Sequence, residues 1–187
     1  MSDFEFIFAL FGLLLGLSIA EVLGGFARAV EQRLRPGSTM RIGWLTPLLG
    51  VFVLLDLLSF WGAAWRVRDV VTVSGPMLVA ITGFAGTYYL AARLTFPSDG
   101  DATTDFDAYF FRIRRIVIGA MAALLLCQLA WYASVPALAA YLLHARPLVL
   151  TVILVVLMTL AMTVRSARAA RLVMLALVAR YIVVYLL

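Results

Sequence analysis

Six apolar stretches, each of about the length needed to cross a lipid bilayer, take up most of this 187-residue chain. A helix rises about 1.5 Å per residue, so about 20 apolar residues span the hydrocarbon layer. A helix also satisfies its own backbone polar groups where no water is present. The sequence therefore predicts an all-α, polytopic integral membrane protein. We expect a compact bundle of six transmembrane helices with approximate spans at 3–30, 42–66, 76–96, 108–133, 147–164 and 168–187.

The composition favours a single transmembrane domain that covers residues 1–187. Hydrophobic residues make up 65% of the chain and charged residues 13%, a balance that soluble globular domains do not reach. The connecting segments are short and leave no room for a separate soluble domain. The piece from Ala137 to His144, between the fourth and fifth spans, is too short to cross a bilayer. We expect it to form a short interfacial or re-entrant helix.

The arginines predict the orientation of the bundle. Short cytoplasmic loops carry an excess of basic residues, and all 15 basic residues of this chain are arginine. The six spans put eleven of them at one face and three at the other, which predicts that both termini lie on the non-cytoplasmic side of a bacterial-type inner membrane. The first face carries Arg28, Arg33, Arg35, Arg41, Arg93, Arg112, Arg114, Arg115, Arg165, Arg168 and Arg171; the second carries Arg66, Arg68 and Arg146.

The same distribution explains the net charge of +5 without any nucleic-acid partner. Beyond the lipid bilayer itself, anionic lipid at the cytoplasmic arginine clusters is a candidate partner. Six spans with this orientation divide into two triplets of opposite direction, so a 3+3 inverted arrangement is possible. The two halves show no convincing self-similarity, and the repeat rests on geometry alone.

Small residues recur at every fourth position of the first span. Gly12, Gly16, Ala20 and Gly24 lie on one helix face, which lets another helix backbone approach closely in lipid. This spacing predicts a helix-packing face. It leaves open whether the face packs within one copy or joins the copies of a homo-oligomer.

Ionisable and polar residues within the spans are the candidate functional residues, since charge is costly in lipid and must face protein or water. Glu21 has no basic residue at its own estimated depth, so it is expected to be protonated and to act as a proton relay or cation ligand. A purely structural alternative is a neutral Glu21 that is hydrogen-bonded to Ser18 or to a backbone carbonyl.

A second polar level is expected just beyond the middle of the bilayer. Asp56 and Arg180 lie at one estimated depth on two helices, roughly 20 Å from the cytoplasmic end of each. We therefore predict an intramembrane ion pair between them, which either fixes the helices or serves as a gate. Gln128 is expected at this level, and Tyr88 lower down, near Glu21.

These residues favour a small oligomeric channel or secondary transporter that passes protons or cations through a polar core. The alternative is a non-catalytic scaffold or accessory subunit that docks a partner through the small-residue face. The single Cys127 and single His144 exclude a paired-cysteine redox site and a three-histidine metal site within one chain. No catalytic motif is present, so we expect no enzyme activity, no metal and no cofactor.

Overall fold

The computed structural model describes residues 3–36, 41–68, 70, 72–98, 105–142 and 144–186. Within these ranges the regular secondary structure is helical, and the only strand-like feature is an isolated bridge between Arg41 and Asp105. The predicted all-α class is therefore confirmed. The helices are α1 (Asp3–Leu34), α2 (Leu45–Arg66), α3 (Gly75–Thr95), α4 (Phe106–Ser134), α5 (Pro136–Leu142), α6 (Ala145–Thr163) and α7 (Ala167–Leu186).

Five of these helices are long and apolar enough to cross a membrane: α1 from Glu5 to Leu34, α2, α3, α4 and α6. The chain thus has the helices of a multi-spanning membrane protein. The short helix α5 lies where a short connecting helix was expected. Helix α7 lies where the sixth span was predicted, and that sixth crossing stays a prediction.

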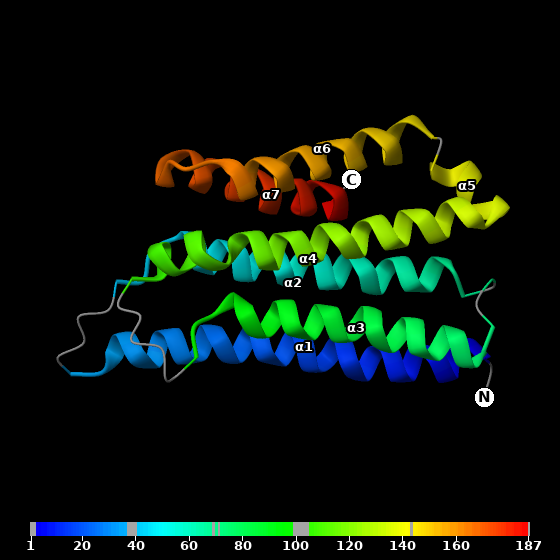
Figure 1. Cartoon of the computed structure of the whole chain (residues 1–187), viewed down its shortest axis with the longest axis horizontal. Coiled ribbons are helices and arrows are strands. Elements are labelled where there is room, and N and C mark those ends of the chain that lie inside the picture. Colours follow the sequence, from blue (N-terminus) through cyan, green and yellow to red (C-terminus); the bar gives the residue numbers. More distant parts are fainter. Residues whose placement is uncertain are drawn as a thin grey trace.

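The long helices run nearly side by side and form three layers (Figure 1). One layer contains α1 and α3, the next α2 and α4, and the last α6 and α7, with contacts within each pair. The middle layer holds the bundle together, because α2 also packs on α7, α4 on α6, and α3 on α4. A residue near the middle of α2 therefore has neighbours from both outer layers.

The direction of the helices gives the bundle two chemically different ends (Figure 1). Helices α1, α3 and α6 end where α2, α4 and α7 begin. We call this the arginine-rich end, because all eleven arginines of the predicted cytoplasmic face lie on the segments near it. The other end, with the start of α1, the α2–α3 connection and α5, is the opposite end.

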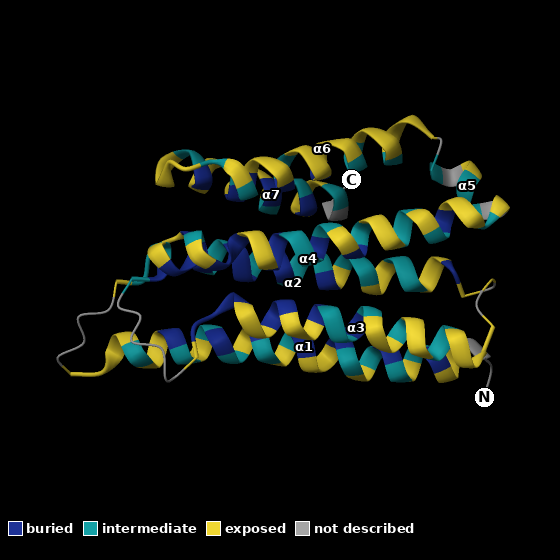
Figure 2. Ribbon diagram, viewed as in Figure 1, coloured by how far each residue is buried: buried dark blue, intermediate teal, exposed yellow. Residues whose placement is uncertain are grey.

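Side chains are apolar both inside and outside the bundle. The interior is filled by large side chains such as Phe52, Phe110 and Ile118, all fully buried. Many large apolar side chains also lie on the outside, among them Leu13 and Val79, and Figure 2 shows exposed residues along the outer faces of the helices. An exterior of this kind is suited to lipid, where exposed apolar groups carry no penalty.

Helices α1, α2 and α3 approach most closely near the arginine-rich end. A Cβ atom on Gly25 would lie 2.3 Å from Cδ2 of Phe96, and one on Gly50 would lie 2.9 Å from Cζ of Phe26. The two phenylalanine rings pack edge to face, with centroids 4.8 Å apart. These two glycines are required because the aromatic rings occupy the space that any side chain would need.

The arginine-rich end is fastened by contacts between connections that are distant in sequence. The backbone N–H of Leu45, at the start of α2, donates a 2.9 Å hydrogen bond to Oδ1 of Asp107 on α4. The Thr46 hydroxyl donates to the carbonyl of Phe106 at 2.6 Å. Asp105 caps its own helix by accepting from the N–H of Asp107. The start of α2 is thus completed by α4.

Arg114 joins α4 to the end of α6. It is buried, and its guanidinium donates to the carbonyl oxygens of Ala161, at 3.0 Å, and Val164. Carbonyls at a helix C-terminus lack intrahelical partners and carry partial negative charge, so a cation stabilises them. Sequence reasoning treated Arg114 only as a marker of orientation.

Candidate functional site

The carboxylate of Asp56, in the second half of α2, joins three helices. Its Oδ2 accepts a 2.7 Å hydrogen bond from the Tyr88 hydroxyl on α3, and its Oδ1 accepts one from the Tyr181 hydroxyl on α7. The tyrosines are 3% and 1% exposed. We call these three residues the Asp56 cluster. It places a carboxylate with two tyrosine donors in the interior of the bundle.

Aromatic rings surround the Asp56 cluster. The Tyr181 ring packs edge to face against Phe52, with centroids 6.0 Å apart. The Tyr88 ring packs against Phe60 at 5.7 Å and Phe84 at 5.5 Å. Apolar walls strengthen electrostatic interactions, because they exclude the water that would screen them. A change in the charge of Asp56 therefore acts directly on its two tyrosine partners.

Arg180 is not the direct ion-pair partner of Asp56, contrary to the prediction. No nitrogen of Arg180 lies within 4.0 Å of an Asp56 oxygen among the described ion pairs. Instead, Nη2 of Arg180 donates a 3.2 Å hydrogen bond to the carbonyl of Leu150 on α6. The guanidinium stacks over the Tyr181 ring, 4.8 Å from its centroid. Arg180 thus lies next to the Asp56 cluster and contacts its member Tyr181, without a direct hydrogen bond to the carboxylate.

Glu21 is not isolated, which corrects the second electrostatic expectation. Its Oε1 accepts a 2.9 Å hydrogen bond from Arg28 on the same helix and a 2.8 Å bond from Arg93 on α3. Two guanidinium groups on one carboxylate favour its ionised form. The Ser18 hydroxyl donates to the carbonyl of Leu14 at 3.0 Å, and no hydrogen bond joins Ser18 to Glu21 among the described contacts. We call Glu21, Arg28 and Arg93 the Glu21 cluster; it links α1 to α3.

Tyr88 lies higher than expected, and the predicted depth of Gln128 stays a prediction. Tyr88 belongs to the Asp56 cluster rather than to the level of Glu21. The Gln128 amide donates to the Tyr132 hydroxyl, one turn further along α4, at 3.3 Å. Gln128 lies on the wall of a cavity and makes no hydrogen bond to Asp56 among the described contacts. The residues expected at one polar level therefore make separate contacts: Asp56 bonds to its tyrosines, and Gln128 lies on the cavity wall.

That cavity, which we call the four-helix cavity, has a volume of about 480 Å³. It lies toward the opposite end, between the first turns of α1 and α3 and the last turns of α2 and α4. Phe60 and Phe84 line it, and the same two rings pack on Tyr88. These two rings, whose centroids are 4.5 Å apart, form the boundary between the cavity and the Asp56 cluster.

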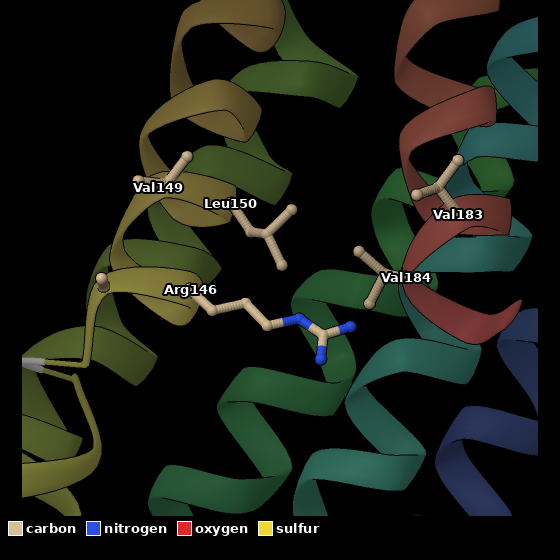
Figure 3. A pocket seen from close by; sticks show the side chains of 6 residues that line it. Arg146, Val149, Leu150, Val183 and Val184 are labelled. Carbon is tan, nitrogen blue, oxygen red and sulfur yellow. The ribbon is translucent and has the colours of Figure 1, made fainter. Parts of the chain in front are cut away.

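A smaller pocket of about 350 Å³ lies between α6 and α7. Figure 3 shows the Arg146 side chain reaching from α6 into this pocket, toward Val184 on α7. Val149, Leu150 and Val183 complete the wall. The pocket therefore offers one guanidinium among aliphatic side chains.

The small-residue face of α1 lies mostly outside the bundle. Gly16 and Ala20 are exposed, and nothing lies within 4 Å of a Cβ atom built on Gly16. Gly12 differs, since a Cβ there would lie 2.8 Å from the Trp61 ring, and Gly24 has only the Arg28 guanidinium at 3.4 Å. The centre of this face is thus free of contacts within the described part of the chain.

The described residues contain no group of three or more histidine, cysteine, aspartate or glutamate side chains that could hold a metal ion. Comparison of the chain with known protein families, with curated proteins and with solved structures finds no match. The functional interpretation therefore rests on the chemistry of the Asp56 cluster, the Glu21 cluster and the four-helix cavity.

Proposed function

We propose that this protein is a small secondary transporter that carries protons across the inner membrane, with Asp56 as the proton-binding group. The observation that carries the proposal is the Asp56 cluster: a carboxylate inside the bundle, bound by one tyrosine from α3 and one from α7. Ionisable groups within membrane spans are costly and most often serve ion or proton pathways. The aromatic packing around the cluster favours a carrier over a continuously open channel.

Protonation of Asp56 would change its contacts with the neighbouring helices. The ionised carboxylate accepts from both tyrosines, whereas the protonated group has one O–H that must itself donate. A tyrosine that accepts this hydrogen bond can no longer donate to the same oxygen. That tyrosine then rotates its hydroxyl and accepts from the carboxyl, while the other tyrosine still donates. In this proposal, the changed hydrogen bond alters the strength of the α2–α3 or α2–α7 contact and so couples the bound proton to helix movement.

Aromatic rings lie between Asp56 and one end of the bundle, and ion pairs lie toward the other end. Toward the opposite end, Phe60 and Phe84 separate the carboxylate from the four-helix cavity. Toward the arginine-rich end, the Glu21 cluster links α1 to α3. In this proposal, movement of the Phe60 and Phe84 rings admits a proton to Asp56 from the opposite end. Loosening of the ion pairs in the Glu21 cluster then releases the proton at the arginine-rich end. Glu21 is then a fastening group, not a relay.

The full topology belongs to the same proposal. Helix α7 forms the sixth span, both termini lie on the non-cytoplasmic side, and the arginine-rich end faces the cytoplasm. The two triplets, α1–α3 and α4 with α6 and α7, have the opposite directions that an inverted arrangement requires.

Proton flux into liposomes tests the proposal. The purified protein is reconstituted with a pH-sensitive dye inside, and a pH gradient is applied while valinomycin and potassium hold the voltage constant. Wild type should dissipate the gradient faster than protein-free liposomes, and Asp56→Asn should lose this activity. Glu31→Gln changes an exposed carboxylate at the end of α1 and should keep it. The proposal fails if wild type adds no flux or if Asp56→Asn matches it.

A second candidate function is that of a non-catalytic accessory subunit, and the exposed centre of the small-residue face favours it. Gly16 has open space around it, so a transmembrane helix of a second copy or of another protein could approach the α1 backbone closely. Gly16→Leu should then reduce chemical cross-linking in native membranes, either between two copies of the chain or between the chain and that protein. The cross-linking reagent is one that does not form disulfides. Gly62→Leu is the control, because Gly62 is equally open but lies on α2.

A further inference from the structure

The four-helix cavity has walls of one chemical kind. The residues around its volume of about 480 Å³ include no aspartate, glutamate, lysine, arginine or histidine. Aromatic rings from all four helices, among them Phe11, Phe60 and Phe84, form much of the surface. Ligand pockets for small organic molecules have volumes of about 300–1,000 Å³ and are mainly apolar, with few polar groups. The cavity has the size and the apolar wall of such a pocket.

Gln128 gives the cavity a polar group with unused capacity. A glutamine amide has two N–H donors and one carbonyl acceptor. One N–H donates to Tyr132, and among the described residues no other hydrogen bond involves this amide. The Thr87 hydroxyl, also on the wall, donates to the Gly83 carbonyl of its own helix at 2.8 Å. Gln128 can therefore both donate to a bound molecule and accept from it.

The absence of charge on the described walls selects against ionic ligands. A charged group that entered an apolar pocket would lose its hydration without finding a counter-ion. The α6–α7 pocket provides the contrast within the same chain, because the Arg146 guanidinium reaches into it (Figure 3). An anionic lipid would find its partner there, whereas the four-helix cavity matches an uncharged molecule.

We propose that the four-helix cavity binds a neutral lipophilic molecule with one hydrogen-bonding group, which contacts Gln128 while the apolar body packs against Phe11, Phe60 and Phe84. Binding there does not require proton transport. A role for the bound molecule as co-substrate rests on the proposed function, because the same Phe60 and Phe84 rings separate the cavity from Asp56.

Cys127 provides a built-in reporter for binding. It is the only cysteine of the chain, it is exposed, and it lines the cavity beside Gln128. The probe is N-phenyl-1-naphthylamine, a neutral aromatic molecule with one N–H. The measurement is the rate at which N-ethylmaleimide modifies Cys127 in detergent micelles, followed by mass spectrometry. The probe should slow this reaction in a saturable way, by at least about fivefold.

Three variants and a second probe separate binding in the cavity from partitioning into the micelle. Gly83 lines the cavity and has open space at its Cβ position, so Gly83→Phe should fill the cavity and abolish protection. Gly62→Phe, equally open but away from the cavity wall, should keep it. Gln128→Leu should weaken binding of the probe about fivefold, which is the effect of losing one neutral hydrogen bond. 1-Phenylnaphthalene lacks the N–H, so it should bind wild type more weakly than N-phenyl-1-naphthylamine does, by the same factor.

The proposal is overturned if the probe gives no protection, or if protection in Gly83→Phe equals that in wild type. It is also overturned if N-phenyl-1-naphthylamine protects Gln128→Leu as strongly as it protects wild type. Asp56→Asn should keep full protection while it loses proton flux. Normal protection without any wild-type flux would reject the proposed function alone, and normal flux without protection would reject the cavity ligand alone.

Discussion

The hydroxyl of Tyr88 donates a 2.7 Å hydrogen bond to Oδ2 of Asp56 and so ties α3 to the middle helix layer. The corresponding bond from Tyr181 ties α7 to the same carboxylate. Helices from both outer layers thus depend on one side chain of α2. This relationship makes the Asp56 cluster a structural link between the helix layers as well as the proposed proton-binding site.

Removal of either tyrosine hydroxyl should destabilise the bundle. We expect Tyr88→Phe and Tyr181→Phe each to lower the free energy of unfolding by about 1–3 kcal/mol, because a partly buried carboxylate loses a hydrogen-bond donor. Tyr89→Phe is the control, since Tyr89 is 37% exposed; its effect should stay within about 0.5 kcal/mol. Thermal unfolding in detergent measures all three. Equal effects for Tyr88→Phe and Tyr89→Phe would contradict the role of the cluster.

The Glu21 cluster should contribute modestly to stability and should not carry protons. Arg93 is 42% exposed, and partly exposed ion pairs contribute about 0.2–1 kcal/mol. We therefore expect Glu21→Gln to keep the Asp56-dependent proton flux. A double-mutant cycle with Arg93→Gln should give a coupling energy below about 1 kcal/mol. Loss of flux in Glu21→Gln, with the fold intact by circular dichroism, would restore Glu21 as a relay.

Asp107 should stabilise α2 from a distance. Its carboxylate accepts from the backbone N–H of Leu45, while Trp44, at the N-cap position, provides no side-chain bond. Asp107→Ala should cost about 1 kcal/mol, the usual effect of a lost helix cap. Hydrogen exchange should increase first at the start of α2, although the substitution lies on α4. An increase confined to α4 would show that the cap contributes nothing.

Two glycines of α1 should respond differently to the same substitution. A Cβ on Gly25 would lie 2.3 Å from the Phe96 ring, so Gly25→Ala should destabilise the bundle by about 1–3 kcal/mol through overpacking. Gly16→Ala meets open space and should be neutral, or stabilising by up to about 1 kcal/mol through helix propensity. Thermal unfolding of both variants checks this, and the opposite order would refute the packing described here.

The helices could be predicted from sequence because apolar length and the Pro and Gly breaks determine them locally. The connecting helix between spans four and five was also predictable, since Pro136 and Pro147 enclose a segment too short to span. The caps made by Asp107 and Arg114 could not be predicted in this way. Each of them serves a different helix, and the sequence does not state which helix ends lie side by side.

The partners of the two acids within the spans were predicted poorly for a related reason. Depth estimates along straight helices put Asp56 with Arg180, but the carboxylate accepts instead from Tyr88 of α3 and from Tyr181, the residue next to Arg180 on α7. For Glu21, the estimate ignored the length of arginine side chains, which place their charge well away from their own backbone position. Arg28, two turns away, and Arg93, on α3, both reach it.

The link from Asp107 to Leu45 also bears on how the protein is made. The two residues are separated by 62 positions, so the start of α2 leaves the ribosome well before the carboxylate that binds it has been synthesised. Until then, water at the membrane surface must satisfy that backbone amide. The start of the second segment therefore reaches its final hydrogen bonding only after the beginning of the fourth segment has been made, so the second half of the chain completes the structure of the first.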